Sequence, residues 1–108
     1  MRHRRDANHD PIREIFERML GGNVSDTASF GSGAGDLYVS YGPCGAWIEI
    51  KRDGKSVLTP AQVEFSRLHS GNWFRVETIE QAENAARIVR ARGMLLDDRI
   101  PRKLAASA

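Results

Sequence analysis

Residues 33–55 of this 108-residue chain, GAGDLYVSYGPCGAWIEIKRDGK, contain the clearest structural signal in the sequence. Two runs of β-branched and aromatic residues, DLYVSY (36–41) and AWIEIK (46–51), flank the sequence GPCG (42–45). Glycine and proline between two such runs are typical of a tight connection between antiparallel strands. The stretch therefore predicts a β-hairpin.

Three charged residues lie within this hairpin. Asp36 begins the first run and Glu49 comes late in the second, so antiparallel pairing brings both carboxylates toward one end. Two carboxylates can hold a hard divalent cation such as Mg²⁺, which keeps several of its waters. Lys51 alternates onto the same face as Glu49 and could reach a metal-bound water or a phosphate oxygen. By spacing alone, a solvated strand face explains the three charges at least as well.

An amphipathic helix is predicted upstream of the hairpin. The segment DPIREIFERML (10–20) has apolar residues at helical spacing, with Asp10 as N-cap, Pro11 in the first turn and Gly21-Gly22 as the stop. A weaker pattern predicts a strand over residues 24–29. The hairpin is thus preceded by a helix and a strand.

Downstream of the hairpin, two further helices and a strand are predicted. The first helix begins after Thr59 as N-cap, and its expected inward stripe consists of Ala61, Phe65 and Leu68. A short strand covers residues 73–77, and a capping box at Thr78 opens the last helix, which is expected to stop near Gly93. The predicted order is αβββαβα, an α/β fold with a mixed sheet flanked by helices.

Length and composition indicate a single domain. The chain has 41% hydrophobic and 28% charged residues, which is near the globular average. We expect residues 1–108 to form one domain, with a core over 7–92 and a basic tail over 93–108. The net charge is +2 with a pI near 9.0, and both ends are basic. The basic ends suit either phosphate contacts or simple solubility.

The remaining composition excludes several classes of protein. A single cysteine, Cys44, rules out an internal disulfide and a multi-cysteine zinc site. The chain has no apolar run of the roughly 20 residues that would cross a bilayer, and it begins without a secretion signal. We therefore expect a cytoplasmic protein without membrane contact. His3 and His69 have no ligand spacing and are expected at the surface.

The motifs as an ordered set resemble the PD-(D/E)xK nuclease superfamily, and most closely its small stand-alone VRR-NUC members. The resemblance covers about residues 6–90: a helix introduced by RDANHDPI, a glycine-rich approach to Asp36, the triplet Glu49-Ile50-Lys51, LTPAQVEF, the strand FRVE and an alanine-rich last helix. It implies a restriction-endonuclease-like αβββαβα core. Nucleases of this type are similar to Holliday junction resolvases, and this one looks like a phage or bacterial protein.

The resemblance also implies roles for individual residues. Asp36, Glu49 and the backbone carbonyl of Ile50 would bind Mg²⁺ or Mn²⁺, and Lys51 would orient or activate the attacking water. Gln62 occupies the place of a glutamine that supports the site in this family. Its position three residues after the N-cap also suits a capping box, so both roles stay open.

The sequence departs from the family pattern in three places. Gly35 stands where a proline often precedes the metal-binding aspartate, and the strand that gives the family its name is RVET (75–78) here. Relatives carry an acidic or amide residue near the start of the first helix, and His9 aligns with it, with Asp10 and Glu14 as neighbours. His9 is therefore a candidate fourth ligand.

The function implied by the resemblance is that of a metal-dependent DNA endonuclease, selective for branched, junction or nicked DNA and active as a homodimer. One alternative is a non-catalytic nucleic-acid-binding module that keeps the nuclease fold. A second alternative is an interaction protein unrelated to nucleic acid. Intact Asp36, Glu49 and Lys51 favour the enzyme over both.

Overall fold

The computed structural model describes residues 9–31, 33–51 and 56–99. In chain order the elements are α1 (His9–Met19), β1 (Val24–Asp26), the 3₁₀ turn η1 (Ala28–Phe30), β2 (Leu37–Tyr41), β3 (Cys44–Ile50), α2 (Pro60–Leu68), β4 (Trp73–Val76) and α3 (Ile79–Arg99). The predicted order of helices and strands is confirmed, with η1 as an addition.

The four strands form one mixed sheet in the order β1-β2-β3-β4. β2 pairs antiparallel with both β1 and β3, whereas β3 and β4 run parallel. Tyr41 pairs with Cys44, so the hairpin turn has only Gly42 and Pro43 at its tip, two residues fewer than expected. Gly42 has φ +57°, which glycine adopts without steric cost and which suits a two-residue hairpin turn. The predicted α/β fold with a mixed sheet is confirmed.

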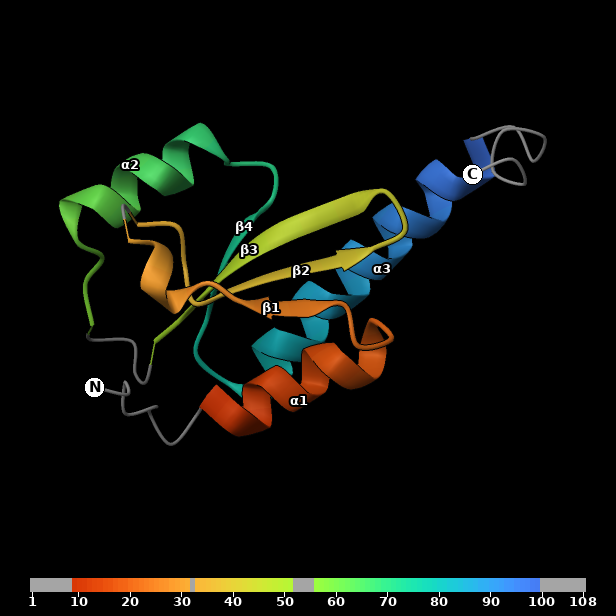
Figure 1. Ribbon diagram of the computed structural model, residues 1–108, viewed down its shortest axis with the longest axis horizontal. Coiled ribbons are helices and arrows are strands. Elements are labelled where there is room, and N and C mark those ends of the chain that lie inside the picture. The colour runs from red at the N-terminus through yellow and green to blue at the C-terminus, as the bar shows by residue number, and fades with distance from the viewer. Residues whose placement is uncertain (1–8, 32, 52–55, 100–108) are drawn as a thin grey trace.

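One face of the sheet is covered by α1 and α3, which lie side by side (Figure 1). Alternation along β2 and β3 directs Leu37, Val39 and Ile48 into this layer, where each is at most 1% exposed. The rest of this core cluster comprises Ile12, Ile15, Phe16, Leu20, Ala46, Ile50, Val76, Ala82, Ala85, Ala86 and Val89. Among the described residues, the hydrophobic core cluster therefore lies on the side of the sheet that α1 and α3 cover.

The opposite face of the sheet is met by α2, which contributes little to the core. None of the nine residues of α2 is buried, and Leu68 is 63% exposed. The predicted inward stripe is wrong for Ala61 and Leu68, which are both exposed. Phe65 is half-buried against Trp47, at a ring-centroid distance of 5.2 Å. α2 thus rests on the sheet through polar and aromatic contacts.

The first strand is shorter than predicted. β1 ends at Asp26, whose side chain accepts a hydrogen bond from the backbone N–H of Ala28 at 3.1 Å. A carboxylate that binds the backbone two residues ahead favours a turn over an extended strand. The chain therefore turns into η1, which carries Phe30 at its end.

The last helix runs beyond its predicted stop. α3 continues through Gly93 to Arg99, so it enters the stretch that was expected to be a basic tail. Gly93 is buried, and a Cβ atom there would collide with the backbone carbonyl of Tyr41. This glycine allows a close approach between α3 and β2, and it does not end the helix. Residues 100–108 lie outside the described part of the chain.

The first helix begins at His9, one residue before the predicted N-cap. Asp10 is therefore inside α1 and not its cap. Pro11 still falls in the first turn, where a backbone N–H would have no partner within the helix. The helix ends at Met19, ahead of Gly21 and Gly22, as expected.

None of the helices described by the structure has both the length and the apolar character that a membrane crossing requires. The longest, α3, has 21 residues, but charged side chains recur along it. This finding agrees with the absence of a long apolar run in the sequence.

Candidate metal site at the end of the hairpin

A pocket of about 140 Å³ opens where β2 begins and β3 ends. Figure 1 shows η1 and α2 lying together beside this end of the sheet. The residues that line the pocket are Ala28, Gly31, Gly33, Ala34, Gly35, Asp36, Glu49 and Gln62. Three of the four predicted catalytic side chains therefore face one space, and the fourth, Lys51, contacts Glu49.

Asp36 is fixed to β3 by two hydrogen bonds. Its backbone N–H donates to the carbonyl of Ile48 at 2.8 Å, and its carboxylate Oδ2 accepts from the backbone N–H of Ile50 at 2.8 Å. The side chain thus takes the place of a backbone acceptor just beyond the end of the strand pairing. This arrangement holds the Asp36 carboxylate against the segment that carries Glu49.

Glu49 is buried, with 5% of the residue exposed. Its Oε2 atom accepts a hydrogen bond from Gln62 Nε2 at 3.0 Å and lies 3.5 Å from Lys51 Nζ. The predicted common face of Glu49 and Lys51 is confirmed by this contact. A buried carboxylate requires such partners, because burial removes the water that would solvate its charge.

Gln62 has both of the contacts that the sequence left open. Its Oε1 accepts from the backbone N–H of Thr59 at 2.9 Å, and its backbone N–H donates to Thr59 Oγ1 at 3.2 Å. The capping box is therefore present. Since Oε1 is used by the cap, Nε2 is the end of the amide that points to Glu49. The helix cap thus orients the Gln62 side chain that donates to Glu49.

The carboxyl group of Glu49 has a strongly raised pKa. Burial, followed by the negative charge of Asp36, raises this pKa from 4.5 to about 7, against the opposing effects of Lys51 and Arg75. Two carboxylates in one pocket repel each other, and a cation between them would relieve that repulsion. The electrostatics of the pocket therefore favour a positively charged ligand.

The glycine-rich segment before Asp36 allows close contact with α2. Gly33 has φ +78°, and a Cβ there would collide with the backbone of Ala61 in the first turn of α2. Thr27, which is 2% exposed, donates its hydroxyl to the carbonyl of Gly35 at 2.9 Å, and its backbone N–H donates to the carbonyl of Asp36 at 2.9 Å. Both contacts hold the backbone that positions the Asp36 carboxylate.

Arg75 lies opposite Glu49 in the register of β3 and β4. Its Nε donates to Glu77 at 2.9 Å, and its guanidinium also donates to the backbone carbonyl of Ser56. Arg75 therefore connects β4 to the segment that leads into α2. Its positive charge also lowers the pKa of Glu49, although less than burial raises it.

The donor groups of the pocket fit a hard divalent cation. Among the side chains that the structure describes, no three from His, Cys, Asp and Glu converge as a metal-binding group. Asp36 and Glu49 supply the two carboxylates, and the carbonyl of Ile50 is the predicted backbone ligand. Mg²⁺ is commonly held by one or two carboxylates and retains several waters, so two side-chain ligands are sufficient.

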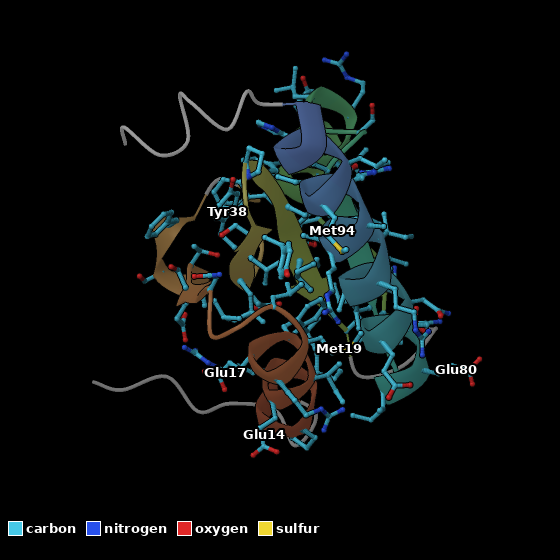
Figure 2. All side chains as sticks on the ribbon, turned by 90° about the vertical axis from the view of Figure 1, so that its right-hand side faces the viewer. Glu14, Glu17, Met19, Tyr38, Glu80 and Met94 are labelled. Atoms are coloured by element: carbon cyan, nitrogen blue, oxygen red, sulfur yellow. The ribbon has the colours of Figure 1, made fainter. Side chains whose placement is uncertain are left out.

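Near the start of α1, the structure places Glu14 but not the side chains of His9 and Asp10. Glu14 is exposed on α1 and does not line the pocket. Figure 2 shows it projecting outward from α1, apart from Tyr38 on β2. Glu14 is therefore a solvated residue and not a ligand of this pocket. His9 begins α1, but its side chain and that of Asp10 lie outside the described part, so the fourth ligand stays a prediction.

Some residues near the site were not expected from the sequence. Thr27 fell within a weak strand pattern, and nothing local indicated its contacts with Gly35 and Asp36. His69 was expected at the surface, yet it is half-buried and stacks on Phe65 with 4.3 Å between ring centroids. The i, i+4 spacing of Phe65 and His69 was the available signal.

Comparison of the chain with protein-family models, with curated proteins and with solved structures found no match.

Proposed function

We propose that this chain is a divalent-metal-dependent nuclease that hydrolyses phosphodiester bonds in DNA. The observation that carries the proposal is the shared pocket of Asp36 and Glu49, with Lys51 and Gln62 both directed at one oxygen of Glu49. Paired carboxylates provide ligands for Mg²⁺ or Mn²⁺, and a neighbouring ammonium suits an anionic substrate. A purely structural salt bridge would not explain a second carboxylate in the same pocket.

The fold and the motifs support the same proposal. The order αβββαβα around a mixed sheet agrees with a restriction-endonuclease-like core. The sequence resemblance to the VRR-NUC family of the PD-(D/E)xK superfamily rests on Asp36, the Glu49-Ile50-Lys51 triplet and LTPAQVEF. These residues come from three elements that meet at one end of the sheet.

Each residue of the site has a distinct role in the proposal. Asp36, Glu49 and the carbonyl of Ile50 would hold the cation, which when bound polarises the scissile phosphate and lowers the pKa of a coordinated water. Lys51, whose side chain is 17% exposed, orients the attacking water or binds a phosphate oxygen. Gln62 is a positioning residue, since it acts through its hydrogen bond to Glu49.

The proposed substrate is DNA with a branch, junction or nick, and the proposed active form is a homodimer that places two sites across the substrate. The chain has 16 lysine and arginine residues against 14 aspartate and glutamate residues. A small positive excess supports sequence-independent contacts with phosphates. A non-catalytic DNA-binding module with the same fold is the alternative.

The test is a cleavage assay on branched, nicked and linear DNA with Mg²⁺ or Mn²⁺. Wild-type protein should cleave at least one substrate, and chelation should abolish cleavage. Glu49→Gln and Lys51→Ala should each lower the rate by about 100-fold or more, since each removes electrostatic stabilisation at the reacting phosphate.

Matched controls are available on the exposed side of α2. Glu64 and Arg67 pair with each other at 2.5 Å and lie outside the pocket, so Glu64→Gln and Arg67→Ala should keep wild-type cleavage. Full activity in both Glu49→Gln and Lys51→Ala would overturn the proposal. DNA binding without cleavage or metal binding would favour the non-catalytic module.

A further inference from the structure

A second hollow, which we call the aromatic groove, opens beside the carboxylate pocket on the face of the sheet turned away from α3. It has a volume of about 450 Å³ and is lined by Phe30, Tyr38, Trp47 and His69, with the polar residues Ser25, Thr27 and Asn72. In Figure 2 Tyr38 lies on the side of the sheet opposite to Met94 of α3. None of these residues belongs to the predicted metal site.

The rings at the floor of the groove support one another. Trp47 makes edge-to-face contacts with Tyr38 at 4.8 Å and with Phe65 at 5.2 Å between ring centroids. His69 stacks on Phe65 at 4.3 Å and lies 6.3 Å from Trp47. Rings held in this way lose little conformational entropy when they bind a planar ligand. The groove therefore offers a preformed aromatic surface.

Phe30 stands at the edge of this groove with 65% of its surface exposed. It ends η1, in which no residue is buried, so the ring has little protein contact. Exposed apolar rings beside a hollow are typical of binding surfaces. A flat ligand in the groove would cover the ring of Phe30.

The groove and the carboxylate pocket share two elements, β3 and η1, each of which contributes residues to both. Trp47 and Glu49 lie two residues apart on one face of β3, which corresponds to roughly 7 Å. The turn η1 contributes Ala28 to the pocket and Phe30 to the groove. A phosphate at the pocket would therefore place the attached nucleotide within reach of the groove.

A nucleobase matches the chemistry of this groove better than an aliphatic ligand does. Its flat π-face can stack on Phe30, Tyr38 or Trp47, and its polar edge can meet the hydrogen-bonding groups of Ser25 and Asn72. In an intact duplex both faces of each base are already stacked and its pairing edge is used. Only an unpaired base can enter.

From these features we infer that the aromatic groove binds an unpaired nucleobase of the DNA strand whose phosphate lies at the carboxylate pocket. This inference rests on the proposed nuclease function, and it names single-stranded character next to the scissile bond as the feature that is recognised. Base stacking is tolerant of sequence, so the groove selects DNA by structure and not by base identity.

The test uses full-length protein in EDTA, so that no cleavage is needed. The probe is a short single-stranded oligonucleotide carrying 2-aminopurine, compared with the same strand in a duplex. Stacking should change the 2-aminopurine fluorescence on binding, and the single strand should bind more tightly than the duplex. Phe30→Ala should weaken single-strand binding by about 5- to 100-fold, and Phe30→Trp should restore it.

Leu95→Ala is the matched control, because Leu95 is similarly exposed at 60% but lies on α3. It should bind both probes as wild type does. Unchanged binding of the single strand by Phe30→Ala would overturn the inference. A lower sedimentation coefficient of DNA-free Phe30→Ala than of DNA-free wild type would also overturn it. That result would show that in the wild type a second copy of the chain covers the groove. If wild-type protein cleaves DNA but binds the single strand no more tightly than the duplex, only this inference is overturned. If wild-type protein stacks the probe but does not cleave DNA, only the proposed nuclease function is contradicted.

Discussion

The carboxyl group of Glu49 receives a hydrogen bond from Gln62 and an ion pair from Lys51, yet its pKa is raised to about 7. Burial and the charge of Asp36 together outweigh the lowering of this pKa by Lys51 and Arg75. Without a bound cation, the pocket therefore does not fully compensate the negative charges of Asp36 and Glu49. Groups at functional sites are often held in environments that disfavour their charged form.

The pKa of Glu49 predicts that the metal-free protein loses stability as the pH rises. Its folded value of about 7 lies above the ordinary value of 4.5, so folding takes up a proton between these values. The stabilisation is present below pH 4.5 and is lost as the pH approaches about 7, a change of about 3 kcal/mol. Denaturant unfolding in EDTA across this range measures it.

Glu49→Gln should remove this loss, because glutamine carries no charge and can still accept from Gln62. The variant should match wild type near pH 4 and exceed it in stability near pH 8. Glu64→Gln is the control. The hydrogen bond from Arg67 lowers the pKa of Glu64, so this exposed pair does not share the loss. Equal pH dependence in wild type and Glu49→Gln would show that the Glu49 carboxyl is not responsible.

The sequence correctly predicted the contacts of those site residues whose positions follow from local geometry. Strand alternation placed Glu49 and Lys51 on one face, and the hairpin brought Asp36 to the same end. The capping box of Gln62 followed from its spacing to Thr59. The contacts of Thr27 could not be predicted, because they are tertiary contacts with Gly35 and Asp36, eight and nine positions further along the chain.

The position of α2 depends on its contact with the glycine-rich segment before Asp36. No residue of α2 is buried, so packing against the core does not fix its position. Gly33 approaches the backbone of Ala61 more closely than any other residue type would allow. The contact places the first turn of α2, and with it Gln62, beside Glu49.

Gly33→Ala should therefore reduce activity more than stability. The added Cβ pushes the first turn of α2 away, and Gln62 then loses its contact with Glu49. A displacement of about 1 Å at a reacting site can cost roughly 100-fold in rate, so we expect a loss of about 10- to 100-fold. Cleavage rates and denaturant midpoints of the same preparations separate the two effects.

Gly31→Ala is a matched control for that variant. Gly31 also has a positive φ of +75°, but a Cβ there would meet nothing within 4 Å. Both variants place a side chain at a positive φ, and only Gly33→Ala adds the collision with α2. Equal losses of activity in the two variants would mean that strain alone, and not the approach to α2, is the cause.

The elements were predictable where caps and periodicity are local, as at Thr59 and along residues 36–51. The prediction failed where a tertiary contact overrides a local signal. Gly93 looked like a helix stop, but it is the point of close approach to the backbone of Tyr41, and α3 continues past it to Arg99. The apolar residues of α2 suggested an inward stripe, although the sheet face they meet is polar and aromatic.

At the scale of the molecule, the core and the site occupy opposite sides of the sheet. α1 and α3 bury the apolar face, while η1 borders both the carboxylate pocket and the aromatic groove and α2 borders the pocket. Substitutions in the pocket should therefore leave the core intact. This separation makes activity and folding independently measurable.

A homodimer is the expected assembly, because one small domain offers little surface for a branched substrate. Sedimentation or light scattering at micromolar concentration should give twice the mass of the 12.0 kDa chain. A monomer would contradict the dimer and would favour nicking or flap cleavage over junction cleavage.

The most direct test of the central claim is calorimetric titration of the purified protein with Mg²⁺ and Mn²⁺, because the claim is that Asp36 and Glu49 jointly hold a divalent cation. Wild type and Glu64→Gln should bind with equal affinity, and Asp36→Asn and Glu49→Gln should each lose about tenfold or more, since each removes a carboxylate ligand. Binding by both ligand variants as tight as wild type, or no binding by wild type at all, would contradict the account.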